Sequence, residues 1–158
     1  MSIQKDIDEF EGAVREFAVV LSGVYGRRKD LVVLREVLPT SIEDYIQQLI
    51  QSVEEGSWDR LIEAAFDSLK WDSYQVERAF ERVSRGVDSS VRERLEQVSS
   101  AVGWLFLRLY RFYDEARRAI FAEKRPQELV GPMREYLREA TSVIRRETTE
   151  IQSLLDAA

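Results

Sequence analysis

The stretch that decides the fold is VRERLEQVSSAVGWLFLRLYRFYDEARRAI, residues 91–120. Its apolar residues recur at alternating intervals of four and three positions, which places them on one narrow stripe of an α-helix. This stripe comprises Val91, Leu95, Val98, Val102, Leu105, Leu109, Phe112 and Ala116, with Ile120 close to it. We therefore expect one long helix of ~35 residues, running from about Ser89 to Glu123.

Two further segments have the same heptad-like pattern. Near the beginning of the chain the stripe is Ile3, Ile7, Phe10, Val14, Phe17 and Leu21. Near the end it is Val130, Met133, Leu137, Ala140, Ile144, Glu147, Ile151 and Leu154. Glu147 is the one charged residue on these stripes, and we interpret it as a register or salt-bridge residue paired with an arginine. No stretch alternates with a period of two for long enough to indicate a strand, so the pattern predicts an all-α helical bundle.

Start and stop signals divide the chain into about six or seven helices. Ser2 can cap the first helix, which should end near Gly23 or Gly26. A short helix is expected from Asp30 to Leu38, where Pro39 should end it. The next helices are expected from Ile42 to Glu55, from a cap at Ser57 to about Leu69, from Asp72 to Gly86, from about Ser89 to Glu123, and from about Pro132 almost to the C-terminus. All of them are expected to form a single domain, residues 1–158.

The composition excludes several kinds of chemistry. The 158 residues include no Cys and no His, so disulfides, thiolate nucleophiles, the usual neutral-pH general base and di-iron Glu-x-x-His sites are all absent. The net charge of −6 argues against general electrostatic binding to nucleic acid or to an anionic membrane. Asn is also missing and Lys is scarce beside Arg, a composition compatible with a thermophile or, equally, with a GC-rich genome.

The same composition leads us to expect a cytoplasmic protein without a membrane segment. No apolar run approaches the ~18 residues needed to cross a bilayer. The N-terminal residues enter a charged amphipathic pattern directly, with no signal-peptide core.

Two basic segments are candidate contacts for an anion or a nucleic acid. Arg27, Arg28 and Lys29 follow a turn with two glycines, and Arg108, Arg111 and Arg118 accompany the aromatic run of the long helix. The alternative interpretation is that these arginines only solvate helix ends and outer faces. Trp104 and Tyr110 lie off the central stripe and are candidate anchors for a protein partner.

Carboxylates are the remaining catalytic option, and their positions do not favour one. Glu93 and Glu96 lie on the outside of the long helix, and only Glu147 falls on an apolar stripe. Magnesium chemistry needs several acids that converge on one inner face. We therefore expect no catalytic residue, no metal and no cofactor.

The long helix also bears on oligomeric state. It should span roughly 50 Å, while the first and last helices reach roughly 30–40 Å. Either the shorter middle helices stack end to end to cover it, or its stripe is buried against a second subunit. We expect a homodimer through the long helix.

The preferred hypothesis is a non-enzymatic bundle that binds a protein partner as an assembly, adaptor or regulatory subunit. The alternative is a nucleic-acid-associated protein, such as a small subunit of a ribonucleoprotein complex. The third hypothesis is a magnesium-dependent all-α phosphohydrolase.

Overall fold

The computed structural model describes residues 3–23, 28–122 and 129–157, without the side chains of Arg28 and Val130. Every regular element in these residues is a helix, and none is a strand, so the all-α prediction is confirmed. The elements are α1 (Ile3–Ser22), α2 (Arg28–Val32), the π-helical turn η1 (Val33–Val37), α3 (Leu38–Glu55), α4 (Arg60–Ser84), α5 (Ser89–Phe121) and α6 (Val130–Asp156).

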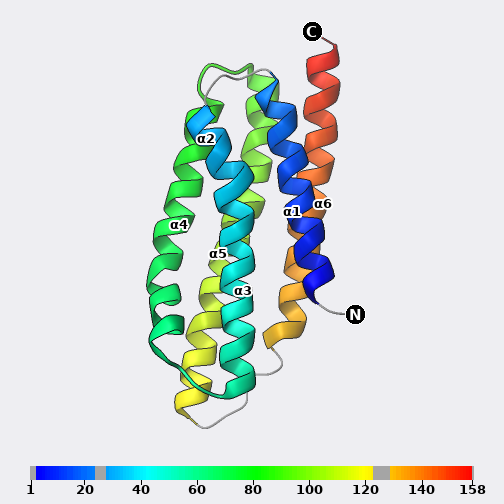
Figure 1. The fold of residues 1–158 in the computed structure, drawn as a ribbon. Helices are drawn as coiled ribbons and strands as arrows, with labels where there is room; N and C mark the ends of the chain where they lie inside the picture. Colours follow the sequence, from blue (N-terminus) through cyan, green and yellow to red (C-terminus); the bar gives the residue numbers. More distant parts are fainter. Residues whose placement is uncertain (1–2, 24–27, 123–128, 158) are drawn as a thin grey trace.

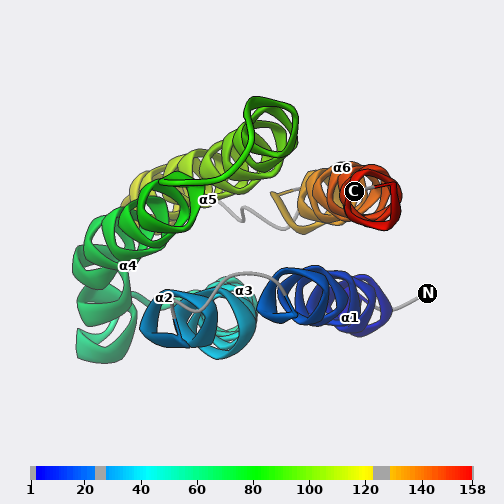
Figure 2. The ribbon, with the colours of Figure 1, turned by 90° about the horizontal axis from the view of Figure 1, so that it is seen from above.

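The helices run alternately up and down and form a bundle (Figure 1). Viewed along the bundle, α1 and α3 lie on one side and α5 and α6 on the other, with α4 beside α3 and α5 (Figure 2). On the side of the bundle away from α4, α1 packs on α6. The described helices include none that combines the length and the apolar character needed to cross a membrane.

The three predicted apolar stripes form the centre of this bundle. All eight predicted stripe residues of α5 are buried, from Val91 to Ala116. On α1 the buried stripe runs from Ile7 to Leu21, and on α6 it runs from Met133 to Ile151. Because α3, α4 and α6 cover α5 along its length, its stripe by itself gives no reason for a second subunit.

The prediction of six or seven helices is slightly wrong, because two expected breaks do not occur and five continuous helices remain in the described residues. The first missing break is at Pro39. A proline inside an α-helix lacks an N–H and its ring clashes with the carbonyl four residues earlier. The π-helical turn η1 lies directly before it, with the Leu38 N–H bonded to the Val33 carbonyl, and its wider spacing lets the helix continue through the proline.

The second missing break is at Asp72, which lies inside α4 and starts no helix. Its carboxylate accepts a hydrogen bond from the Tyr45 hydroxyl of α3, so its polarity serves a tertiary contact. The N-terminal cap of α4 also lies two residues later than predicted. Asp59, and not Ser57, accepts hydrogen bonds from the Leu61 and Ile62 amides.

Two buried acids join α6 to its neighbours. Glu147 is 1% exposed and accepts hydrogen bonds from Arg94 of α5 at 3.2 Å and from Arg146 at 3.1 Å. This confirms the interpretation of Glu147 as an arginine-paired residue on an apolar stripe. Asp6 of α1 does the same with Arg134 and Arg138 of α6, at 2.8 and 3.0 Å. Burial alone would raise the pKa of Asp6, but the hydrogen bonds and charges of the two arginines outweigh it and hold that pKa below its usual range.

Aromatic side chains join α3, α4 and α5. The Tyr113 hydroxyl is buried and donates to the Tyr45 carbonyl at 2.5 Å. Phe66 stacks on Tyr113 with ring centroids 5.8 Å apart and contacts Tyr110 at 4.9 Å. Burial raises the pKa of the Tyr113 hydroxyl, as expected for a group that must remain neutral inside the bundle.

Candidate protein-interaction face

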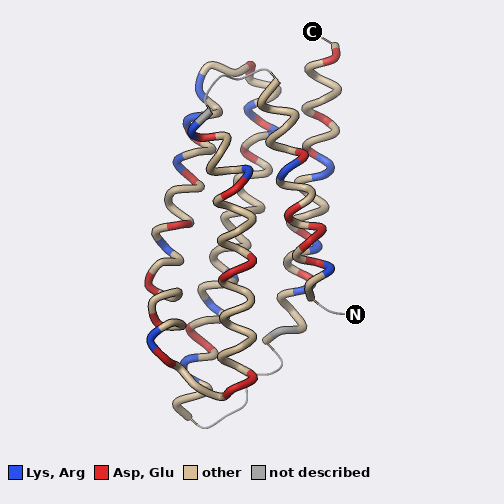
Figure 3. The backbone as a smooth tube through the Cα atoms, viewed as in Figure 1, with Lys and Arg blue, Asp and Glu red and all other residues tan. Residues whose placement is uncertain are grey.

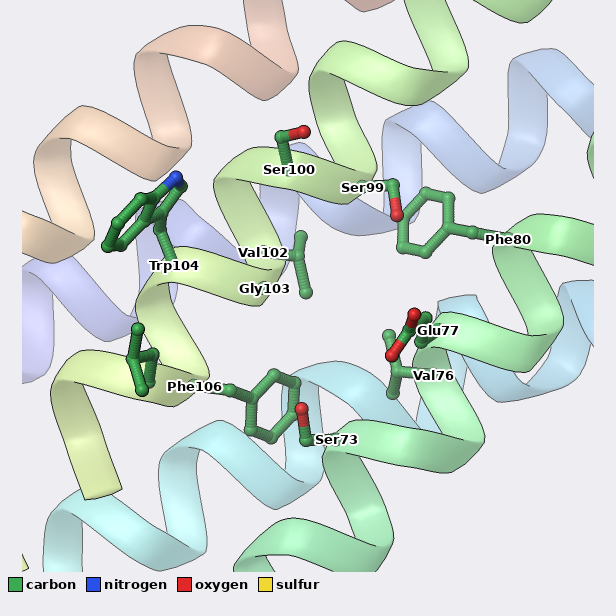
Figure 4. Close-up of a pocket in the computed structure, with 11 residues that line it drawn as sticks. Ser73, Val76, Glu77, Phe80, Ser99, Ser100, Val102, Gly103, Trp104 and Phe106 are labelled. Atoms are coloured by element: carbon green, nitrogen blue, oxygen red, sulfur yellow. The ribbon is translucent and has the colours of Figure 1, made fainter.

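A groove of about 350 Å³ lies on the outside of the bundle between α4 and α5 (Figure 4). We call it the α4–α5 groove. Ser73, Val76, Glu77 and Phe80 of α4 line one wall, and Ser99, Ser100, Val102, Gly103, Trp104, Phe106 and Leu107 of α5 line the other.

The groove exists because several of its residues have short side chains. Ser73 lies beside Phe106 and Ser99 lies beside Phe80, with Gly103 between these two levels of α5 (Figure 4). The outer surface is low at these positions, where a longer side chain would fill the space. A Cβ added to Gly103 would meet no atom within 4 Å of the described structure. The space beside Gly103 is therefore open to a surface that approaches from outside.

Large apolar side chains that line the groove or lie on the exposed side of α4 are in contact with water. Trp104 and Leu107 of α5 are 55% and 41% exposed. On α4, Trp71 and Tyr74 are 60% and 51% exposed, and their rings stack with centroids 5.9 Å apart. Several exposed aromatic side chains on one pair of helices are typical of a binding surface, whereas a single exposed leucine needs no explanation. We call these four residues and the groove the α4–α5 face.

Charged residues lie at the two ends of this face. Glu77 and Glu96 lie toward the loop that joins α4 to α5, and Lys70 and Arg111 lie toward the opposite end. All four side chains are exposed, and none forms an ion pair with another described residue. Lys70 lies over the Tyr110 ring at 5.0 Å from its centroid, which fixes its level along α5.

Trp104 also lines a second, smaller groove of about 250 Å³ between α5 and α6. There Arg108 lies over the Tyr136 ring at 4.0 Å and bonds Glu139 at 2.8 Å. Since Trp104 borders both grooves, it forms the ridge between them.

The structure separates the two predicted partner anchors. Trp104 is exposed on the α4–α5 face, as a docking residue must be. Tyr110 is partly buried, with its ring between Phe66 and Lys70, and it serves the packing of α5 on α4.

The predicted basic residues do not gather into one cationic surface. Arg108 pairs with Glu139, and Arg118 pairs with Asp114 at 3.0 Å. Arg111 and Lys29 are exposed. Arg27 and the side chain of Arg28 lie outside the described residues. Over the described helices, acidic and basic positions are interspersed along the bundle (Figure 3).

Trp71, Tyr74 and Leu107 were missed by the sequence analysis. The two aromatics lie at a point where a helix break was expected, so they were assigned to no face of a helix. In a continuous α4 they lie away from the apolar stripe of Leu69, Val76 and Phe80, and this offset was a readable signal.

Three carboxylates that the sequence analysis did not single out also meet. Asp8 and Glu11 of α1 and Glu43 of α3 have oxygens within 4.8 Å of one another. Burial and the adjacent Glu43 raise the pKa of Glu11 to about 7. A proton held by Glu11 relieves the repulsion among the three carboxylates.

The chain matches no protein-family model, no curated protein and no solved structure.

Proposed function

We propose that this protein acts in the cytoplasm by binding another protein chain through the α4–α5 face. It is then an assembly, adaptor or regulatory subunit, and its activity requires neither catalysis nor a cofactor. The observation that carries the proposal is the exposure of four large apolar side chains on α4 and α5. Trp104 and Leu107 line the groove, and Trp71 and Tyr74 lie on the exposed side of α4.

Exposure of these side chains to water costs free energy. Each Å² of apolar surface left in water is unfavourable by about 25 cal/mol, and a partner that covers it recovers that free energy. Trp and Tyr dominate the binding energy of protein interfaces because they bury a large area with few rotatable bonds. The groove beside them gives a partner side chain a place to insert.

The charges support a protein partner over a nucleic acid. A nucleic-acid surface needs arginines and lysines that are available to phosphates. Here two of the predicted basic residues, Arg108 and Arg118, pair with acids of the same chain. Glu77 lies inside the groove itself and would repel a phosphate.

Site-specific photocrosslinking in native cells tests the proposal. A benzoylphenylalanine at Leu107 or at Tyr74 should give discrete protein adducts. The same probe at Val19, an exposed apolar residue of α1 far from the face in sequence, is the matched control. Adducts at Leu107 and Tyr74 but not at Val19 are expected. Equal labelling at all three positions, or none, would contradict the proposed function.

A further inference from the structure

We propose that the partner at the α4–α5 face is a second copy of this chain, packed about a twofold axis that lies in the face and crosses both helices. This inference rests on the proposed function and names its partner. The order of residues along α4 and α5 supports it.

The charges give the first part of the argument. Along the face, Glu77 and Glu96 lie on one side of its apolar centre, and Lys70 and Arg111 lie on the other. A twofold axis perpendicular to the helices turns Glu77 and Glu96 of one copy toward Lys70 and Arg111 of the other. An axis parallel to the helices would instead place acids against acids and bases against bases, which disfavours binding.

The helix positions give the second part. With the perpendicular axis, α5 packs antiparallel on α5 of the second copy. The register that places Glu96 opposite Arg111 also places Trp104 opposite Gly103 and Leu107 opposite Ser100. Each large apolar side chain then meets one of the smallest residues of the face, so the surfaces can approach closely.

The same rule holds on α4. The register that places Lys70 opposite Glu77 also places Tyr74 opposite Ser73. One operation therefore matches Lys70 and Arg111 with acids, and matches Tyr74, Trp104 and Leu107 with small residues, so these parts of the face are complementary to themselves. Self-complementarity of this kind is what a twofold symmetric interface requires.

The first experiment uses the absence of cysteine from this chain, because an engineered cysteine is then the only thiol. Gly103→Cys lies next to the proposed axis and should form a disulfide-linked dimer under mild oxidation. Gly12→Cys is the matched control, since Gly12 is also an exposed glycine inside a helix whose Cβ would meet no described atom within 4 Å. Crosslinking at Gly103 and not at Gly12 is expected. Equal crosslinking at the two positions would overturn the inference.

The second experiment tests the register with charge variants in sedimentation equilibrium. Lys70→Glu/Arg111→Glu makes the face acidic, and Glu77→Lys/Glu96→Lys makes it basic. Each variant alone should dimerise at least about tenfold more weakly than the natural chain, because like charges then face each other. An equimolar mixture should regain dimers that contain one chain of each kind. Circular dichroism checks that both variants remain folded.

The outcomes separate this inference from the proposed function. A natural chain that stays monomeric at high concentration, while Leu107 crosslinks to proteins of other masses in cells, rejects the second copy and leaves the proposed function standing. A dimer that survives both charge variants unchanged uses another surface and also rejects the inference. A photocrosslinked adduct at Leu107 with twice the mass of the chain, together with mixed dimers in the second experiment, supports both the inference and the proposed function.

Discussion

The two sides of α5 differ in whether their side chains are paired with other residues of the chain. Toward α6, charges are paired across the helix contact: Arg94 meets Glu147, and Arg108 meets Glu139 while lying over Tyr136. Toward the outer groove, Ser99, Ser100 and Gly103 leave space. On one side, α5 is therefore paired with residues of its own chain, and on the other side its surface is open to water.

This difference indicates which residues serve the fold and which serve binding. An acid that is buried with its arginines fixes how α6 packs, since it has no other low-energy position. An exposed tryptophan beside a groove contributes less to folding than a buried one, because about half of its surface stays in water in the folded chain. Substitutions on the two sides of α5 should therefore divide into those that change stability and those that change association.

The largest effect is expected at Glu147. The Glu147→Ala substitution leaves Arg94 and Arg146 without their buried acceptor and creates a small void between α5 and α6. Breaking a buried ion pair costs 3–5 kcal/mol when the remaining charge is trapped. Both arginines here are partly exposed and can rotate toward water, so we expect a loss of about 2 kcal/mol in the free energy of unfolding.

Urea denaturation measures this loss. Glu150→Ala is the control, because Glu150 lies on the same helix and is exposed. It should change stability by less than about 0.5 kcal/mol. Equal effects at the two positions would mean that the Glu147 contacts do not hold α6.

A smaller effect of opposite sign is expected at Glu11, where an acid on α1 meets other acids and its ion-pair partner Arg15, at 3.7 Å, is exposed. Its pKa of about 7 in the folded chain, against the ordinary value of 4.5, means that the folded state binds the proton more tightly. The carboxyl therefore costs stability as the pH rises from 4.5 to 7, and the loss is complete above pH 7. Glu11→Gln removes this ionisation and should stabilise the chain by about 1 kcal/mol at pH 8 and by almost nothing at pH 4.

Urea denaturation of both chains between pH 4 and pH 8 measures the effect. The exposed Glu16→Gln on the same helix is the control and should give no pH-dependent difference. If Glu11→Gln destabilises the chain at pH 8, the three carboxylates do not repel one another in the folded state.

The sequence predicted the interior better than the surface, for a physical reason. A buried stripe must repeat with the period of the helix, so the burial of Leu95, Leu105 and Ile144 could be predicted from their spacing alone. The π-helical turn before Pro39 leaves no such signal, because the same residues would also fit a helix end. Predicting it requires knowledge that Leu34, Leu38 and Ile42 are all buried in one bundle.

The candidate face was only half predictable. Trp104 stood out because it lies off the apolar stripe of α5. Tyr110 lies off that stripe as well, and its environment depends on Phe66 and Lys70, which reach it from another helix. Which off-stripe aromatic is exposed is decided by the neighbouring helix, and the position of that neighbour is tertiary information.

The smallest effect on folding is expected at Leu107. A change in association without a change in stability at this residue would distinguish the two sides of α5 most clearly. Leu107→Ala removes a side chain that is 41% exposed, so the free energy of unfolding of the dilute monomer should fall by less than about 0.5 kcal/mol. In the natural chain the melting temperature should rise with protein concentration, because dimerisation stabilises only the folded state. Leu107→Ala should weaken that dependence. Calorimetry over a hundredfold range of concentration measures both quantities. A large loss of stability in the dilute variant would instead place Leu107 among the residues that hold the fold.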